Sequence, residues 1–110
     1  MAKDLNVTVL LDAYGQLLTD KQRGAIDLYY NEDFSLAEIA EEMGISRQGV
    51  LASIKQGEGH LNEYEEKLGV VSRFRSISGK ITEIETIMDS AEFQGADRVK
   101  KLLSDIKTEI

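Results

Sequence analysis

The sequence predicts an all-α protein whose first part is a helix-turn-helix domain, followed by extra C-terminal helices. Apolar residues recur every three or four positions along nearly the whole chain, which is the period of amphipathic helices and not the alternation of strands. The 110 residues include no proline, so helices can end only at glycines and turn residues. Two capping-box sequences also mark helix starts. Together these observations favour a small helical bundle over any fold with a sheet.

The N-terminal part carries one apolar stripe followed by two capping boxes. Thr19 with Gln22, and Ser35 with Glu38, have the three-residue spacing in which side chain and backbone cap each other. Each box precedes residues of helical period, so each predicts a helix start. Three helices are expected here: residues 7–18, 20–31 and 36–43.

The third helix and the start of the next have the spacing of a helix-turn-helix unit. Ala40 is small enough to let two helices cross closely, and Gly44 allows the positive φ of a tight turn. Ile45 and Val50 would fill the angle between the helices, while Ser46 caps the second one.

The fourth helix is predicted to be long, because its apolar positions form a heptad stripe. A hinge is expected at 57–59, where two glycines flank a glutamate. The stripe could pack along a partner helix or a second subunit, or it could close the core of the domain itself. Its members are Val50, Ile54, Gly57, Leu61, Tyr64 and Leu68.

Residues 70–110 are predicted to be a helical extension of the helix-turn-helix domain at 1–69. Gly95 separates two stripes, and Asp97 is the expected cap of the second one. The extension should pack on the domain or on a second subunit, and we expect a homodimer because the stripes exceed what so short a chain easily buries. The stripes consist of Ile77, Ile81, Ile84, Met88 and Ala91, and of Val99, Leu102, Leu103, Ile106 and Ile110.

The start of the fourth helix is the predicted nucleic-acid-binding surface, because the second helix of such units enters the major groove by its N-terminal residues. Arg47 could pair with guanine and Gln48 with adenine. Residues 35–56 nevertheless carry a net charge of −1, so duplex DNA should bind weakly, and the unit could instead dock protein. The surface comprises Ser46, Arg47, Gln48, Gly49, Ala52, Lys55 and Gln56.

A second candidate surface is the stretch 68–82, which contains no acidic residue. Phe74 lies between two arginines and could stack a base while the cations hold RNA phosphates. The alternative is a solvated basic segment that offsets acidic neighbours. The residues of this basic patch are Arg73, Phe74, Arg75 and Lys80.

The sequence contains no group of residues with the composition or spacing expected for a catalytic, cofactor-binding or metal-binding site. The chain has no cysteine, and His60 is its single histidine, expected to be exposed on a helix. Adjacent glutamates such as Glu65 and Glu66 diverge on a helix and should be solvated, and the four tyrosines should be core aromatics with hydroxyls in water. A net charge of −7, with neither a signal peptide nor a spanning segment, indicates a cytoplasmic protein without membrane insertion.

Seven short segments carry a family resemblance: residues 14–19, 21–23, 28–30, 35–42, 46–48, 54–55 and 64–69. Through them, residues 10–68 resemble the YlxM family of small bacterial helix-turn-helix proteins. The resemblance implies a domain similar to region 4 of sigma factors, and a regulatory or accessory role in the signal recognition particle pathway. The expected partner is then the RNA or protein of that particle. A transcription regulator that reads duplex DNA and a pure protein–protein adaptor are the alternatives.

Overall fold

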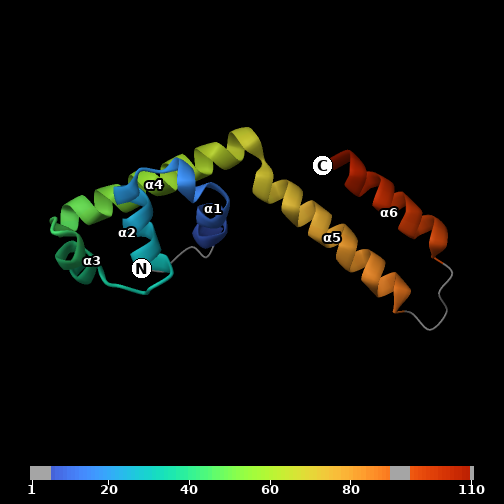
Figure 1. Ribbon diagram of the computed structural model, residues 1–110, viewed down its shortest axis with the longest axis horizontal. Coiled ribbons are helices and arrows are strands. Elements are labelled where there is room, and N and C mark those ends of the chain that lie inside the picture. Colours follow the sequence, from blue (N-terminus) through green and yellow to red (C-terminus); the bar gives the residue numbers. More distant parts are fainter. Residues whose placement is uncertain (1–5, 90–94, 110) are drawn as a thin grey trace. The chain divides into compact units, whose positions relative to one another are not determined.

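The computed structural model describes residues 6–89 and 95–109. The described residues form α-helices and one 3-10 turn and contain no strand, which confirms the all-α prediction (Figure 1). The chain divides into two compact units, residues 1–69 and residues 70–110. The first unit contains α1 (Asn6–Tyr14), η1 (Gly15–Leu17), α2 (Asp20–Tyr30), α3 (Leu36–Met43) and α4 (Arg47–Leu68), and the second contains α5 (Val70–Met88) and α6 (Ala96–Glu109).

The first helix ends earlier than its apolar stripe predicts. After Tyr14 the chain tightens into η1, in which the Leu18 N–H donates to the Gly15 carbonyl at 3.1 Å. Gly15 is buried against Leu11, and a Cβ built on it would lie 3.1 Å from Leu11 Cδ1. The tighter turn brings Leu18 into the core directly before the cap of α2.

Both predicted capping boxes are present. Thr19 Oγ1 accepts from the Gln22 N–H at 3.1 Å, and Gln22 Oε1 accepts from the Thr19 N–H at 3.3 Å. Before α3, Ser35 Oγ accepts from the Glu38 N–H at 3.1 Å, and Glu38 Oε1 accepts from the Ser35 N–H at 3.0 Å. Each box satisfies backbone donors that the first turn of a helix leaves without an internal partner.

The box at α3 makes the stability of the first unit sensitive to acid. Hydrogen bonds from the backbone N–H and the hydroxyl of Ser35 hold the pKa of Glu38 below its usual value of 4.5. A lowered folded-state pKa means that this stabilisation is present above pH 4.5 and is lost as the pH falls through the lower, folded-state pKa. Glu38→Gln keeps the acceptor but removes the titration.

We therefore expect the free energy of unfolding to fall less steeply below pH 4.5 in Glu38→Gln than in the wild type. Urea titrations at several pH values, followed by tyrosine fluorescence, measure the difference. Glu41→Gln leaves the capping box intact and serves as the control. In this variant the free energy of unfolding should fall below pH 4.5 as steeply as in the wild type. Equal slopes for the wild type and Glu38→Gln would contradict the assignment.

The turn between α3 and α4 forms as predicted. Gly44 has φ +66°, and the Ile45 N–H donates to the Ala40 carbonyl at 3.0 Å, which ends α3. Ser46 then caps α4, because its Oγ accepts from the Gly49 N–H at 3.0 Å. Two separate helices joined by a three-residue connection result.

The long helix α4 closes the core of its own unit. It contacts α1, α2 and α3, and the first four members of its heptad stripe, from Val50 to Leu61, are buried. Tyr64 is half-buried and Leu68 is 48% exposed, so the stripe leaves the core near its end. The other buried apolar residues of this unit are Val7, Leu10, Leu11, Tyr14, Leu18, Ala25, Ile26, Tyr29 and Ile39.

The hinge expected at 57–59 is absent, because α4 is continuous from Arg47 to Leu68. Gly57 is buried against α2, where a Cβ would overlap Ile26 Cδ1. The glycine is therefore needed for a close helix crossing, and the packing on α2 offsets its low helix propensity.

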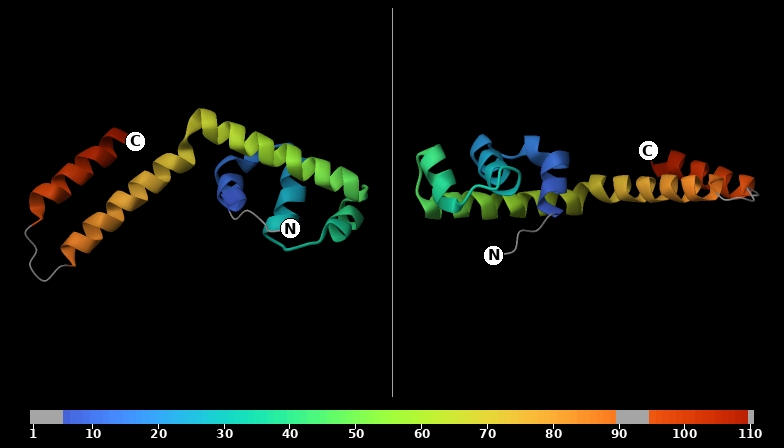
Figure 2. Two further views of the ribbon diagram at one scale, coloured as in Figure 1. Left: turned by 180° about the vertical axis from the view of Figure 1, so that it is seen from behind. Right: turned by 90° about the horizontal axis from the view of Figure 1, so that it is seen from below.

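The second unit is an antiparallel helical hairpin, with α5 and α6 side by side in every view (Figure 2). Arg98 Nη2 pairs with Glu83 Oε1 at 2.7 Å across it. Helix α5 begins at Val70, earlier than the apolar stripe indicates. The prediction that Asp97 caps α6 is wrong. Asp97 lies in the first turn of the helix, and the Val99 N–H donates to the Gly95 carbonyl at 2.9 Å. Ala91 and Ile110 lie outside the described residues.

Candidate nucleic-acid interface

The candidate interface is the first two turns of α4, and most of the predicted residues are exposed there. Gln48, Ala52 and Lys55 are spaced by four and three residues, so they share the side of α4 opposite the buried Val50 and Ile54. Arg47 and Gln56 are also exposed and lie on either side of this line. The side chains that would read a partner therefore reach solvent.

Two of the predicted residues help to form the turn before α4. Ser46 uses its Oγ to cap the helix, and Gly49 is half-buried against the turn. A Cβ on Gly49 would lie 3.3 Å from Ser46 Oγ and 3.6 Å from Ile45 Cδ1. The structure thus assigns these two residues to building the turn, and leaves five to face a partner.

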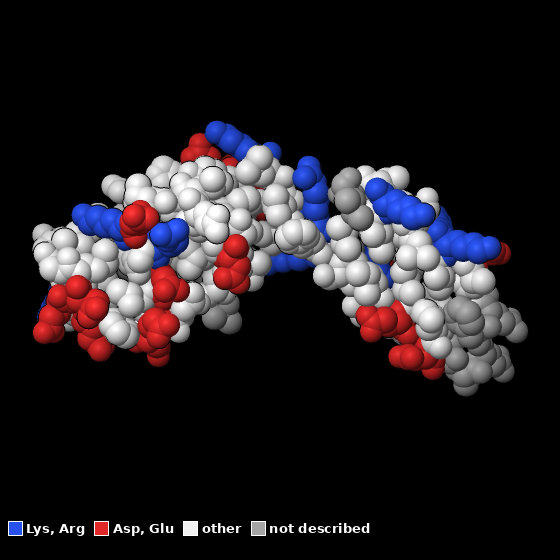
Figure 3. Space-filling view, in the orientation of Figure 1, with Lys and Arg blue, Asp and Glu red and all other residues white. Residues whose placement is uncertain are grey.

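Acidic side chains occupy the neighbouring helix. Glu38, Glu41 and Glu42 are exposed on α3 and, with Phe34, line an open pocket of about 300 Å³. In Figure 3 acidic atoms gather over this end of the first unit. The first helix of a DNA-reading unit crosses the phosphate backbone, so these carboxylates would repel a duplex docked in that way.

The basic patch of α5 is not gathered into one surface. Arg73 and Lys80 are seven residues apart and lie within about 20° of each other around the helix, whereas Arg75 lies about 200° from Arg73. Lys80 Nζ donates to Ser76 Oγ at 3.1 Å. Phe74 is 62% exposed, at about 100° from Arg73. A single strand could not contact all three cations and the ring on one side of the helix.

Three tyrosine hydroxyls hold α4 in place, a role that sequence reasoning missed. Tyr14 donates to Glu65 Oε1 at 2.6 Å, Tyr30 to Glu58 Oε1 at 2.5 Å, and Tyr64 to the Leu17 carbonyl at 3.3 Å. The expectation that hydroxyls such as that of Tyr14, and the carboxylate of Glu65, face only water is therefore wrong. Their partners lie 28 to 51 residues away in sequence, so no local signal could have revealed them.

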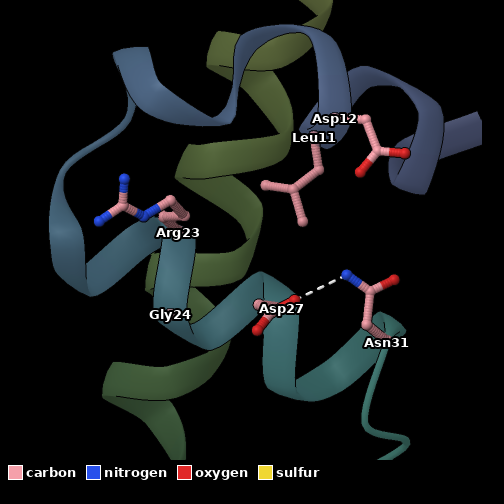
Figure 4. A pocket seen from close by; sticks show the side chains of 6 residues that line it. All are labelled: Leu11, Asp12, Arg23, Gly24, Asp27 and Asn31. Carbon is pink, nitrogen blue, oxygen red and sulfur yellow. Dashed lines mark hydrogen bonds between the residues drawn. The ribbon is translucent and has the colours of Figure 1, made fainter.

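A pocket between α1 and α2 was also missed. It has a volume of about 320 Å³ and is shown in Figure 4. Asn31 Nδ2 donates to Asp27 Oδ1 at 2.7 Å, while the Arg23 guanidinium pairs with Asp20 at 3.0 Å and points away from the pocket. The lining residues are Leu11, Asp12, Arg23, Gly24, Asp27 and Asn31.

The described residues hold no cluster of three side chains suited to a metal ion. His60 is exposed on α4, with its ring stacked on Tyr64 at 6.3 Å between centroids. Among the helices that the structure describes, none has the length and apolarity that crossing a bilayer requires.

Comparison with known proteins agrees with this architecture. A family model, UPF0122, described as "Putative helix-turn-helix protein, YlxM / p13 like", matches residues 1–106. A UPF0122 protein of Desulforamulus reducens is 41% identical over 104 residues, covering 91% of this chain and 89% of that protein. One from a Thermoanaerobacter species is 42% identical over 107 residues (96% and 92%), and one from Acetivibrio thermocellus is 50% identical over 84 residues (76% and 72%).

The resemblance to the YlxM family is thereby confirmed, and the match continues through both helices of the second unit up to residue 106. The chain belongs to the UPF0122 family of YlxM- and p13-like helix-turn-helix proteins.

Proposed function

We propose that this protein is a non-enzymatic regulatory or accessory factor of the bacterial signal recognition particle pathway, acting in the cytoplasm. In this proposal the start of α4 binds the RNA or the protein of the particle. The observation that carries it is the set of exposed polar side chains at the start of α4: Gln48 and Lys55 share one side of the helix, and Arg47 lies beside them, on a pair of helices that are both capped. The resemblance to YlxM proteins supplies the pathway.

The charges around the candidate interface favour a partner that makes a small, local contact over a long nucleic-acid duplex. Helix α3, which packs on α4, carries three exposed carboxylates against the two cations of the candidate interface, Arg47 and Lys55. Affinity for a nucleic acid then depends on a few directed hydrogen bonds, because phosphate neutralisation is small. A local RNA feature or a protein surface satisfies that condition.

Fluorescence titration of the chain with the particle's RNA and with its protein, each in low and moderate salt, tests the proposal. We expect saturable binding to at least one component. Arg47→Ala combined with Gln48→Ala should weaken it at least about tenfold, the size expected for lost bidentate contacts. Lys67→Ala removes a cation from the other end of α4 and should leave the affinity unchanged. Binding to neither component would overturn the proposal.

The alternative, a transcription regulator reading duplex DNA, is favoured by the helix-turn-helix geometry itself. It expects a salt-sensitive footprint that Arg47→Ala with Gln48→Ala abolishes. It further expects Glu41→Gln with Glu42→Gln to tighten binding, since two charges facing phosphates are removed. If the protein is instead a protein–protein adaptor, we expect no footprint on DNA. Binding to its protein partner should then be unaltered by Arg47→Ala with Gln48→Ala.

A further inference from the structure

The helical hairpin of the second unit has one apolar face that neither of its helices covers. Phe74, Ile81 and Met88 are 62%, 45% and 60% exposed. They are seven residues apart, so they form a single stripe along α5. An exposed stripe of large apolar side chains on a two-helix unit normally has a partner, because two helices cannot enclose a core.

Helix α6 contributes to the same face. Leu102 is buried, whereas the adjacent Leu103 is 46% exposed. One residue turns the helix by about 100°, and because α6 is antiparallel to α5 this turn carries Leu103 toward the same side as the α5 stripe. The ion pair of Arg98 with Glu83 lies on the opposite side of the hairpin by the same geometry.

The two edges of this apolar face carry opposite charges over the C-terminal half of α5. Glu85 and Asp89 border it there, whereas Arg75 lies on the same edge near the start of α5, and Lys100 and Lys107 border the face on α6. Figure 3 shows uncharged surface between acidic atoms along α5 and basic atoms along α6. A surface with one acidic and one basic edge is complementary to a rotated copy of itself.

We propose that a second copy of this chain docks on the apolar face, so that two hairpins form a four-helix bundle about a two-fold axis parallel to the helices. That axis places α5 of one chain against α6 of the other. The acidic edge then lies beside the partner's basic edge, with Glu85 near Lys100 of the partner subunit. The exposed apolar residues of both copies meet in the centre as an added core.

The size of the face fits a dimer of moderate affinity. A helix of 14 residues such as α6 is about 21 Å long, and two packed helices are about 20 Å wide. Each copy would therefore cover roughly 500 Å², or about 1,000 Å² in total, the lower bound of specific interfaces. Interfaces of this size are often weak or transient, so we expect a dissociation constant in the micromolar range.

The first unit offers no comparable stripe for this face. Its exposed large apolar residues, Val9, Leu17 and Leu68, come from α1, η1 and the end of α4. They do not follow one another along one helix at heptad spacing. The surface best matched to the apolar face is therefore that face itself, on another copy.

Sedimentation velocity of the full chain, from a few to about a hundred micromolar, should show a monomer–dimer equilibrium. Ile81→Glu places a charge at the centre of the stripe and should raise the dissociation constant at least about tenfold. Gly79→Glu adds the same charge on the outer side of α5, where a Cβ meets nothing within 4 Å, and should leave the dimer intact. Far-UV circular dichroism verifies that both variants remain helical.

Charge exchange tests the orientation. Glu85→Lys and Lys100→Glu should each weaken the dimer a few-fold in low salt, and together they should restore it. Failure of the double variant to recover would overturn the proposed axis.

A wild type that stays monomeric would overturn the proposal altogether. With a monomeric wild type, the effect of Ile81→Glu on the urea unfolding of the first unit shows what covers the apolar face. A changed unfolding midpoint would mean that the first unit of the same chain covers it, and an unchanged midpoint would mean that a different protein does. The test is independent of the proposed binding at the start of α4, because it measures the mass of the chain without a ligand.

Discussion

Replacing Leu61 by alanine should lower the free energy of unfolding of the first unit by about 2–5 kcal/mol. Leu61 is fully buried at the middle of α4, the helix that contacts α1, α2 and α3. Truncation removes the transfer free energy of the lost carbons and leaves a cavity that the packed core cannot easily close. A unit of this size has only a few kcal/mol of net stability, so the change approaches the whole of it.

Urea unfolding measures this loss selectively. All four tyrosines lie in the first unit, so their fluorescence reports on it without a contribution from the helical hairpin. Leu68→Ala is the matched control, since Leu68 is on the same helix but 48% exposed, and its cost should stay below about 1 kcal/mol. Equal losses for the two variants would show that the core is not centred where α4 crosses the other helices.

Gly57→Ala should destabilise the same unit by about 1–2 kcal/mol, although alanine is the better helix former. The added Cβ would overlap Ile26 Cδ1 and lie 3.4 Å from Gln22 Cβ. Ile26 is fully buried, so its Cδ1 can move aside only if the side chains around it repack; we expect this overpacking to cost about 1–3 kcal/mol against a propensity gain of up to about 1 kcal/mol.

Gly59→Ala provides the control two residues further along α4. Position 59 is exposed, and a Cβ there meets nothing within 4 Å, so the propensity gain of up to about 1 kcal/mol should appear undiminished. Ile26→Val removes the atom that the new Cβ meets. In that background Gly57→Ala should therefore cost at least about 1 kcal/mol less, and additive losses in the double variant would contradict the proposed overlap.

The sequence was sufficient wherever the determining interaction is local. The capping boxes of Thr19 and Ser35, and the positive φ of Gly44, depend on atoms within a few residues of one another. The same holds for most of the candidate interface. Ser46 fixes where α4 begins, and the buried Val50 and Ile54 fix which side of it remains in solvent. Their spacing therefore predicted the exposed Gln48.

Other features depend on which helices meet, and the sequence left them open or gave the wrong answer. The two glycines at 57 and 59 predict a hinge in α4. In the structure α4 is continuous there, and Gly57 packs closely against Ile26 of α2. Arg73 and Arg75 are near neighbours in sequence, yet α5 continues through them and directs them to nearly opposite sides.

By itself, then, the sequence determined that this chain is helical, where most of its helices begin and end, and that it carries a helix-turn-helix of the YlxM type. Capping, glycine turns and apolar period act over a few residues and are written directly in the order of the amino acids. Only the tertiary structure decided that α4 closes its own core, that Tyr14 and Tyr30 hold it through Glu65 and Glu58, and that the hairpin leaves an apolar face open. Those features are contacts between residues distant along the chain, so they exist only once the helices have been brought together.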